Sequence, residues 1–257
     1  MNTDGLDILA ANLSQLSVAP PRSLTDLVFA QWSLVTAPLG TVYVAFTDTG
    51  IDYVRLATAG FGEAAFLDSY RDRFQRPLRP AARPPAGVLP ALNGRGAANL
   101  RLNLSGLTEF ERAVLDVARR IPAGQTRPYS WVADRIGRPK AVRAVGTALG
   151  NNPVPLLIPC HRVTRMTGDP GEYVFGRRIK ERLLRSENVN LDEVAELASR
   201  NVYFIGSATT HIVCYPTCAC ARRITERHRR GFKTVAEAAR HGYRPCKRCT
   251  PAMASSA

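Results

Sequence analysis

Alternating apolar and polar positions predict a small sheet early in the chain. Residues 30–56 contain three such runs, separated by turn-forming residues at 38–40 and 48–50, and we expect a three-stranded meander there. Helical spacing of apolar residues predicts a helix over 62–74. The stretch 77–96 is rich in Pro, Ala and Arg and is typical of a loop.

From Thr108 onward the pattern becomes helical. Thr108 and Glu111 have the spacing of a capping box ahead of an apolar helical face. A short helix over Ser130–Ile136, a turn and a second helix over Lys140–Gly150 then predict a helix-turn-helix, whose second helix enters the major groove of DNA. An ordinary contact between two tightly packed helices is the alternative.

The second helix of this unit has two different faces. We expect its inward face to carry the larger apolar residues Val142, Val145 and Leu149. Its outward face carries Arg143 and otherwise short side chains, namely Ala141, Ala144, Gly146, Thr147 and Ala148. Short side chains would let the helix backbone approach DNA closely.

The net charge of the chain favours a polyanionic partner. It is +14 with a pI near 10.1, and the excess lies after residue 100, because residues 1–100 carry equal numbers of basic and acidic side chains. Nucleic acid is the usual polyanion for such a chain; a merely solvated basic surface is the alternative. We find no signal peptide and no membrane span, and expect a cytoplasmic, nucleoid-associated protein without membrane contact.

Cys160 is the leading candidate nucleophile. An apolar run over Val154–Ile158, which we expect to form a strand, ends abruptly in Pro159-Cys160-His161-Arg162. A neighbouring imidazole and guanidinium would favour the thiolate, which is the reactive form of cysteine. A buried inert cysteine beside a structural histidine, or a cysteine hydrolase built on Cys160 and His161, are the alternatives.

The string Pro-Cys-His-Arg-Val, preceded by Asn-Pro-Val-Pro and the helix-turn-helix, resembles the O⁶-alkylguanine-DNA alkyltransferase family over about residues 30–188. The resemblance implies single-use transfer of an alkyl group from O⁶-alkylguanine in double-stranded DNA to Cys160, with O⁴-alkylthymine as a further candidate substrate. It implies a flipped base, no soluble cofactor and a monomer. A non-catalytic damage sensor or transcriptional regulator is the alternative.

The same resemblance assigns roles to individual residues. His161, through a water, and Glu187 would deprotonate the thiol, and Asn152 would be the hinge between the recognition helix and the active-site strand. Tyr129 would crowd the phosphate and Tyr173 would donate its hydroxyl to the purine. Arg143 would fill the space left by the flipped base, and the expected DNA-binding set also includes Thr147 and Arg162. An acidic Glu172 beside Tyr173 departs from the family pattern and leaves alkyl size open.

A cysteine-rich module ends the chain. Cys214 and Cys218, and then Cys246 and Cys249, form two close pairs, which suit zinc held by four sulfurs. Cys220 is left over, and the three histidines after residue 200 could replace a ligand. The flanking residues resemble the zinc domain of the bacterial Ada protein over about residues 200–252, which implies that Cys214 also accepts methyl from DNA methylphosphotriesters. A purely structural zinc ligand is the alternative.

The expected fold class is therefore α+β in three parts. These are a small antiparallel sheet domain, ribonuclease-H-like by resemblance, a helical alkyltransferase domain and a zinc-bound α+β module. The expected boundaries are an extension over 1–29 and domains over 30–100, 101–190 and 198–253.

Overall fold

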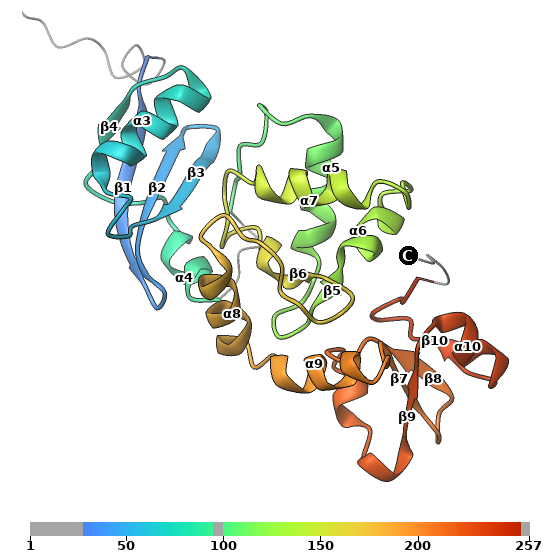
Figure 1. Ribbon diagram of the computed structural model, residues 1–257. Helices are drawn as coiled ribbons and strands as arrows, with labels where there is room; N and C mark the ends of the chain where they lie inside the picture. Colours follow the sequence, from blue (N-terminus) through green and yellow to red (C-terminus); the bar gives the residue numbers. More distant parts are fainter. Residues whose placement is uncertain (1–27, 95–99, 253–257) are drawn as a thin grey trace, which may run out of the picture.

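The computed structural model describes residues 28–94 and 100–252, so most of the predicted extension lies outside the described residues. Figure 1 shows a sheet with one covering helix at one end, a group of helices in the middle and a small sheet module at the other end. The fold is α+β, as predicted. Among the described helices, none is long and apolar enough to cross a membrane.

The first sheet has the strand order β3-β2-β1-β4. Its strands are β1 (Ala30–Ala37), β2 (Gly40–Thr47), β3 (Gly50–Leu56) and β4 (Leu78–Pro80). The predicted three-stranded meander is confirmed as β1, β2 and β3, which pair antiparallel. The prediction of a loop over 77–96 is wrong in two places: β4 pairs parallel with β1, and α4 is a short helix over Val88–Leu92. β4 was not predicted because it contains Pro80, and proline in a run of residues argues against a strand. Proline is tolerated at the edge of a sheet, which is where β4 lies.

Side-chain alternation gives this sheet two buried faces. Helix α3 (Glu63–Phe74) covers one face, where Phe66 stacks on Tyr43 with ring centroids 4.9 Å apart. Val42 and Val44 point to the other face and join the core shared with the helical part. The period of two along β2 therefore joins the sheet to the rest of the molecule.

The middle of the chain is helical. Its helices are α5 (Glu109–Arg119), α6 (Tyr129–Arg135), α7 (Val142–Gly150), α8 (Arg177–Ser186) and α9 (Leu191–Ser199). The predicted capping box is confirmed, since the Glu111 amide donates to Thr108 Oγ1 at 3.2 Å and the Thr108 amide donates to Glu111 Oε2 at 3.0 Å. Helices α6 and α7 form the predicted helix-turn-helix.

The two-faced description of α7 needs one correction. Val145 and Leu149 are buried as expected, but Ala148, expected on the outward face, is only 3% exposed. Arg143, Ala144 and Thr147 are exposed. The outward face is therefore narrower than predicted, because Ala148 lies one residue before Leu149 on the buried side.

The expected strand over Val154–Ile158 is absent from this part of the described chain. The run forms turns with an isolated bridge between Pro155 and Ile158, and Leu156 has a φ of +74°. Cys160 then opens a 3₁₀ turn, η2 (Cys160–Arg162), which is followed by β6 (Val163–Thr164) paired with β5 (Arg127–Pro128). Two prolines and the left-handed Leu156 prevent a regular strand here.

The C-terminal module is a second small sheet with the order β10-β8-β7-β9. Its elements are β7 (Phe204–Ser207), β8 (Ile212–Cys214), β9 (Arg229–Phe232), α10 (Val235–Arg240) and β10 (Arg244–Pro245). Gly206 is required in β7, because a Cβ there would lie 2.7 Å from the rings of Phe232 and Tyr243.

Candidate active site

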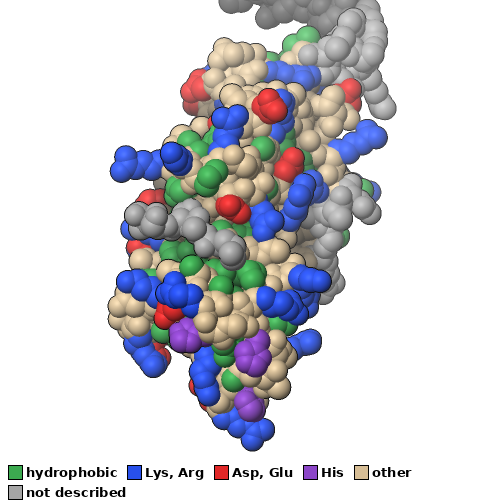
Figure 2. Space-filling model, turned by 90° about the vertical axis from the view of Figure 1, so that its right-hand side faces the viewer, with side chains coloured by type: hydrophobic (Ala, Val, Ile, Leu, Met, Phe, Trp, Pro, Cys, Tyr) green, Lys and Arg blue, Asp and Glu red, His purple; other side chains and the backbone are tan. Residues whose placement is uncertain are grey.

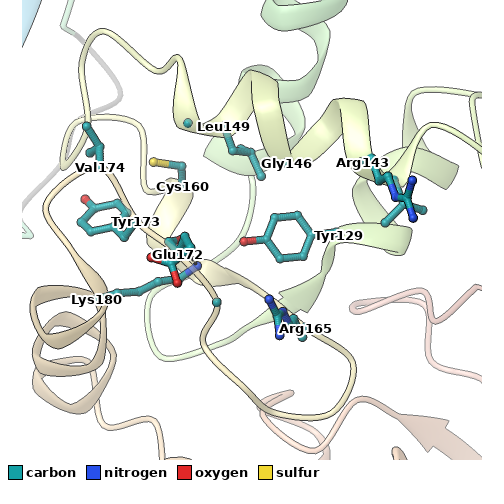
Figure 3. Close-up of a pocket in the computed structure, with 13 residues that line it drawn as sticks. Tyr129, Arg143, Gly146, Leu149, Cys160, Arg165, Glu172, Tyr173, Val174 and Lys180 are labelled. Atoms are coloured by element: carbon teal, nitrogen blue, oxygen red, sulfur yellow. Dashed lines mark hydrogen bonds between the residues drawn. The ribbon is translucent and has the colours of Figure 1, made fainter.

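A cavity of about 560 Å³ opens beside the helix-turn-helix. Its walls come from α6, α7, the loop before α8 and α8 itself, and Cys160 lies among its lining residues (Figure 3). In this view Arg143, near the start of α7, lies farther from Cys160 than Gly146 and Leu149 of the same helix. A pocket of this size can hold a nucleic-acid base.

The Cys160 thiol is held at the inner end of this cavity. Cys160 is 4% exposed, and the Nδ2 atom of the fully buried Asn152 lies 3.1 Å from its Sγ. The same Nδ2 donates to the Ile158 carbonyl at 3.2 Å, and Asn152 Oδ1 accepts from the Val154 amide at 3.0 Å. Asn152 therefore shapes the turn that carries the thiol and also offers a hydrogen bond to its sulfur.

Burial raises the pKa of the Cys160 thiol above its usual range. The Asn152 amide and the positive charges of Lys180 and Arg55 act in the opposite direction and lower it. Lys180 of α8 and Arg55 of β3 therefore supply positive charge that the sequence analysis did not predict. The expected contribution of the neighbouring His161 and Arg162 stays a prediction.

His161, Glu187 and Arg162 form a hydrogen-bonded group behind the thiol. His161 Nε2 lies 3.0 Å from Glu187 Oε1, and Arg162 donates to both carboxylate oxygens, with its Nη2 2.8 Å from Oε1 and its Nε 3.0 Å from Oε2. Burial lowers the pKa of His161, so the ring is neutral at pH 7. Burial opposes ionisation of Glu187, but the hydrogen bonds from His161 and Arg162 outweigh it and lower its pKa to about 2.

This geometry fixes the tautomer of His161. An ionised Glu187 only accepts hydrogen bonds, so Nε2 carries the proton and Nδ1 keeps its lone pair. Nδ1 is buried and finds no hydrogen-bond partner among the described residues. A neutral imidazole with a free lone pair, oriented by a carboxylate, is suited to accept a proton.

Arg162 lies elsewhere than expected for a DNA contact. Its Nη1 donates to the Ile121 carbonyl at 2.7 Å, its other nitrogens bind Glu187, and its side chain is 16% exposed. Arg162 lines a separate cavity of about 330 Å³ together with His161 and Glu187. The guanidinium is therefore engaged within the protein, where it holds Glu187 as an anion.

Two tyrosines face the cavity. The hydroxyl of Tyr173 is buried without a hydrogen-bond partner among the described residues, and burial raises its pKa well above 10. Tyr129 starts α6 and contacts Gly171, where a Cβ would lie 3.1 Å from the Tyr129 hydroxyl. Gly171 has a φ of +73°, so both its conformation and this contact favour glycine. Thr147 is exposed on α7 and is not among the residues that line the cavity.

Lys180 was missed by the sequence interpretation. It is 1% exposed, and its Nζ donates to the carbonyls of Val163 at 2.7 Å and Glu172 at 3.2 Å. Burial lowers its pKa to about 8. Lys180 therefore places a cation beside the thiol and anchors the loop that carries Tyr173. One lysine in the basic run 177–182 gives no sequence signal of burial.

Arg55 was also missed. Its Nη1 donates to the carbonyls of Val54 at 2.7 Å and Pro153 at 3.3 Å, and its guanidinium carbon lies 3.8 Å from the centroid of the Tyr53 ring. These contacts join the edge of the first sheet to the turn that follows Asn152. The first sheet thus contributes a charge to the site, although its sequence carries no obvious chemistry.

The four expected zinc ligands meet in the C-terminal module. The sulfur atoms of Cys214, Cys218, Cys246 and Cys249 lie within 4.8 Å of one another, and all four residues are buried. Four convergent thiols suit tetrahedral zinc, so the residues fit this metal. The three histidines of the module are outside this group, and Cys220 is half-buried beside it.

A helix-turn-helix beside a base-sized pocket with a buried thiol defines a DNA-binding cysteine transferase. A family model for the DNA-binding domain of 6-O-methylguanine DNA methyltransferase matches residues 109–189, and one for the metal-binding domain of Ada matches residues 193–252. A methylated-DNA–protein-cysteine methyltransferase of Methanosarcina acetivorans is 33% identical over 159 residues, which cover 61% of this chain and 97% of the relative.

The other comparisons agree. The bifunctional transcriptional activator and DNA repair enzyme Ada of Escherichia coli is 35% identical over 171 residues, covering 62% of this chain but only 46% of Ada. The crystal structure of Mycobacterium tuberculosis OGT in complex with DNA aligns with a TM-score of 0.52 at 27% identity, over 64% of this chain and 98% of that one. The chain belongs to the methylated-DNA–protein-cysteine methyltransferase family and carries an Ada-type zinc-binding domain.

Proposed function

We propose that this protein repairs double-stranded DNA by moving the alkyl group of O⁶-alkylguanine irreversibly to Sγ of Cys160. The single observation that carries the proposal is the buried Cys160 thiol at the inner end of a base-sized cavity beside a helix-turn-helix. Exposed basic residues on the helical part and the zinc module suit the phosphate backbone, and Figure 2 shows Lys and Arg prevailing over Asp and Glu on one face.

The reaction divides into proton transfer and displacement. His161, oriented by Glu187, takes the thiol proton at Nδ1 through a bridging water, which gives the thiolate. The sulfur then attacks the alkyl carbon: the S–C bond forms, the C–O bond breaks, and the bonding pair stays on the guanine oxygen. The Tyr173 hydroxyl donates to the purine and stabilises the leaving base.

The remaining residues act on DNA or support the catalytic groups. Arg143 fills the space that the flipped base leaves, and Tyr129 crowds the adjacent phosphate. Thr147, which is exposed on α7, contacts the DNA backbone. Asn152 and Lys180 stabilise the thiolate, by a hydrogen bond and by charge. Arg162 positions Glu187 and, being engaged within the protein, does not contact DNA in this mechanism.

The product determines how often the protein acts. A thioether is stable in water at neutral pH, and none of the described residues is placed to hydrolyse it, so each molecule acts once and needs no soluble cofactor. We propose that it acts as a monomer, at the nucleoid in the cytoplasm. We also propose the domain limits 30–100, 101–190 and 198–253.

Zinc-bound Cys214 is a second candidate acceptor, favoured by the match to the metal-binding domain of Ada. Zinc, when bound, keeps the four thiols deprotonated. Cys214 is only 1% exposed, and the loop after it packs on the helical part through Tyr215 and Thr217. Cys214 must therefore become accessible before a methylphosphotriester can reach it.

Transfer of label tests the proposal. The protein is incubated with duplexes that carry isotopically labelled O⁶-methylguanine or methylphosphotriester, and label is located by peptide mass. We expect label from methylguanine on the Cys160 peptide and none in Cys160→Ser. Tight lesion binding without labelled protein would refute the transferase and favour a damage sensor; label from methylphosphotriester on Cys214 would establish the second activity.

A further inference from the structure

The loops of the zinc module are packed directly against helix α6 of the helix-turn-helix. The indole Nε1 of Trp131 donates to the carbonyls of Cys249 and Thr250, both at 3.1 Å. One turn further along α6, Arg135 Nη2 donates to the Thr250 carbonyl at 3.0 Å. Trp131 is 8% exposed, so its hydrogen bonds are shielded from water.

The other ligand loop packs against the residues just before α6. The Thr126 amide donates to Thr217 Oγ1 at 2.9 Å, and Thr217 Oγ1 donates to the Thr126 carbonyl at 3.2 Å. Thr217 lies between the ligands Cys214 and Cys218, and its side chain and that of Thr126 are buried. The next residue, Arg127, has its guanidinium carbon 5.4 Å from the Tyr215 ring centroid.

A third contact lies beside Glu187, the carboxylate that orients His161. Arg222 Nη1 donates to the Asn188 carbonyl at 3.4 Å, next to Glu187 in the chain. Glu187 Oε2 accepts from the Gly124 amide at 3.1 Å, so the turn before Thr126 and the Glu187 segment are already joined. The zinc module therefore contacts two segments beside the active site: the residues just before α6 and the residue that follows Glu187.

These contacts depend on the shape of the metal loops. Thr217 and Cys249 belong to the ligand loops themselves, and Thr250 directly follows the last ligand. A small module with four thiolate ligands takes its loop conformation from the bound metal. One continuous core then runs from these cysteines through Trp131 to Val145 of α7 and to Cys160.

We propose that the zinc module is a staple for the catalytic domain: metal binding at Cys214, Cys218, Cys246 and Cys249 orders α6, and through it the recognition helix α7. Trp131 and Thr217 are the positioning residues that transmit this order. Zinc occupancy then controls how fast Cys160 receives the alkyl group. The inference rests on the proposed function for its rate, but its structural part is independent of it.

The test compares the full chain with zinc bound, the same chain after zinc removal by a chelator, and three variants, one of which is a control. Thr217→Val removes the hydroxyl at nearly constant volume, and Thr210→Val makes the same change at an exposed threonine of the same module as a control. Trp131→Phe keeps an aromatic ring but removes the indole donor. The zinc content of each variant is measured, because an effect of the substitution counts only if the variant still binds zinc.

Two readouts are taken: hydrogen exchange of the amides in α6 and α7, and the single-turnover rate of transfer from an O⁶-methylguanine duplex. We expect zinc removal to speed exchange in both helices and to slow transfer. Thr217→Val with zinc bound should slow transfer about tenfold, which corresponds to about 1.4 kcal/mol. Thr210→Val should match the wild type.

The outcomes separate the two proposals. Unchanged exchange in α6 and α7 after zinc removal and in zinc-loaded Thr217→Val would overturn the staple, even if Cys160 is methylated normally. Absence of methyl on Cys160 in the zinc-loaded wild type would refute the proposed function, while faster exchange after zinc removal would still support the staple. If Trp131→Phe does not fold, Thr217→Val and zinc removal decide the question.

Discussion

Replacing Glu187 by Gln should destabilise the protein and slow alkyl transfer together. The substitution keeps the shape of the side chain but removes the negative charge that Arg162 neutralises. Glu187 is 16% exposed and receives hydrogen bonds from His161, Arg162 and the Gly124 amide. Because His161 is neutral, Arg162 is the charge partner that Glu187→Gln leaves without a counterion.

The size of the effect follows from the pKa of Glu187, which lies at about 2 in the folded protein against an ordinary value of 4.5. At about 1.4 kcal/mol per pKa unit, ionised Glu187 contributes about 3 kcal/mol to the free energy of unfolding. Because the folded-state pKa is the lower one, this contribution is complete above pH 4.5 and is lost as the pH falls towards 2.

Urea unfolding followed by tryptophan fluorescence measures this difference. We expect Glu187→Gln to lose about 3 kcal/mol at pH 7, and the gap to the wild type to close below pH 4.5. Asp192→Asn is the matched control, since Asp192 also binds an arginine through two oxygens but is 79% exposed. An equal loss in both variants, or a gap independent of pH, would refute the reasoning.

Three further substitutions test the pocket. Asn152→Ala should raise the pH needed for Cys160 to react with iodoacetamide, because the sulfur loses the hydrogen bond at 3.1 Å; an unchanged pH profile would show that this bond does not favour the thiolate. Lys180→Gln should slow the same reaction below pH 8 and differ less from the wild type above it, because the Lys180 charge is lost as the pH rises through about 8; a constant ratio across pH 8 would contradict the charge effect. Arg143→Ala should slow transfer from duplex DNA roughly tenfold and leave the iodoacetamide reaction unchanged; equal losses in both would mean that Arg143 acts on the thiol.

Local signals in the sequence predicted local features well. The capping box at Thr108, the helix-turn-helix and the first three strands all depend on residues close together in the chain, and the structure confirms them. The four zinc ligands were predicted equally well, because the two cysteines of each ligand pair lie only a few residues apart in the chain. The left-handed Leu156, by contrast, has no sequence signature, so the turn before Cys160 was mistaken for a strand.

Contacts between distant segments escaped prediction for a physical reason. In the sequence, Lys180 and Arg55 resemble ordinary surface cations. Only the packing of α8 and of the first sheet around Cys160 places their charges where they favour its thiolate. Arg162 beside Cys160 was expected to reach DNA, but Glu187 attracts it inward. The contact of Trp131 with the last zinc ligand spans 118 positions and has no local pattern.

Stoichiometry tests the central claim most directly. A fixed amount of zinc-loaded protein is mixed with increasing excess of a duplex that carries one labelled O⁶-methylguanine, and both repaired guanine and methylated Cys160 are counted. We expect repair to stop at one guanine per chain, with an equal amount of S-methylated Cys160. Continued repair beyond one guanine per chain, or repair without methyl on Cys160, would contradict it.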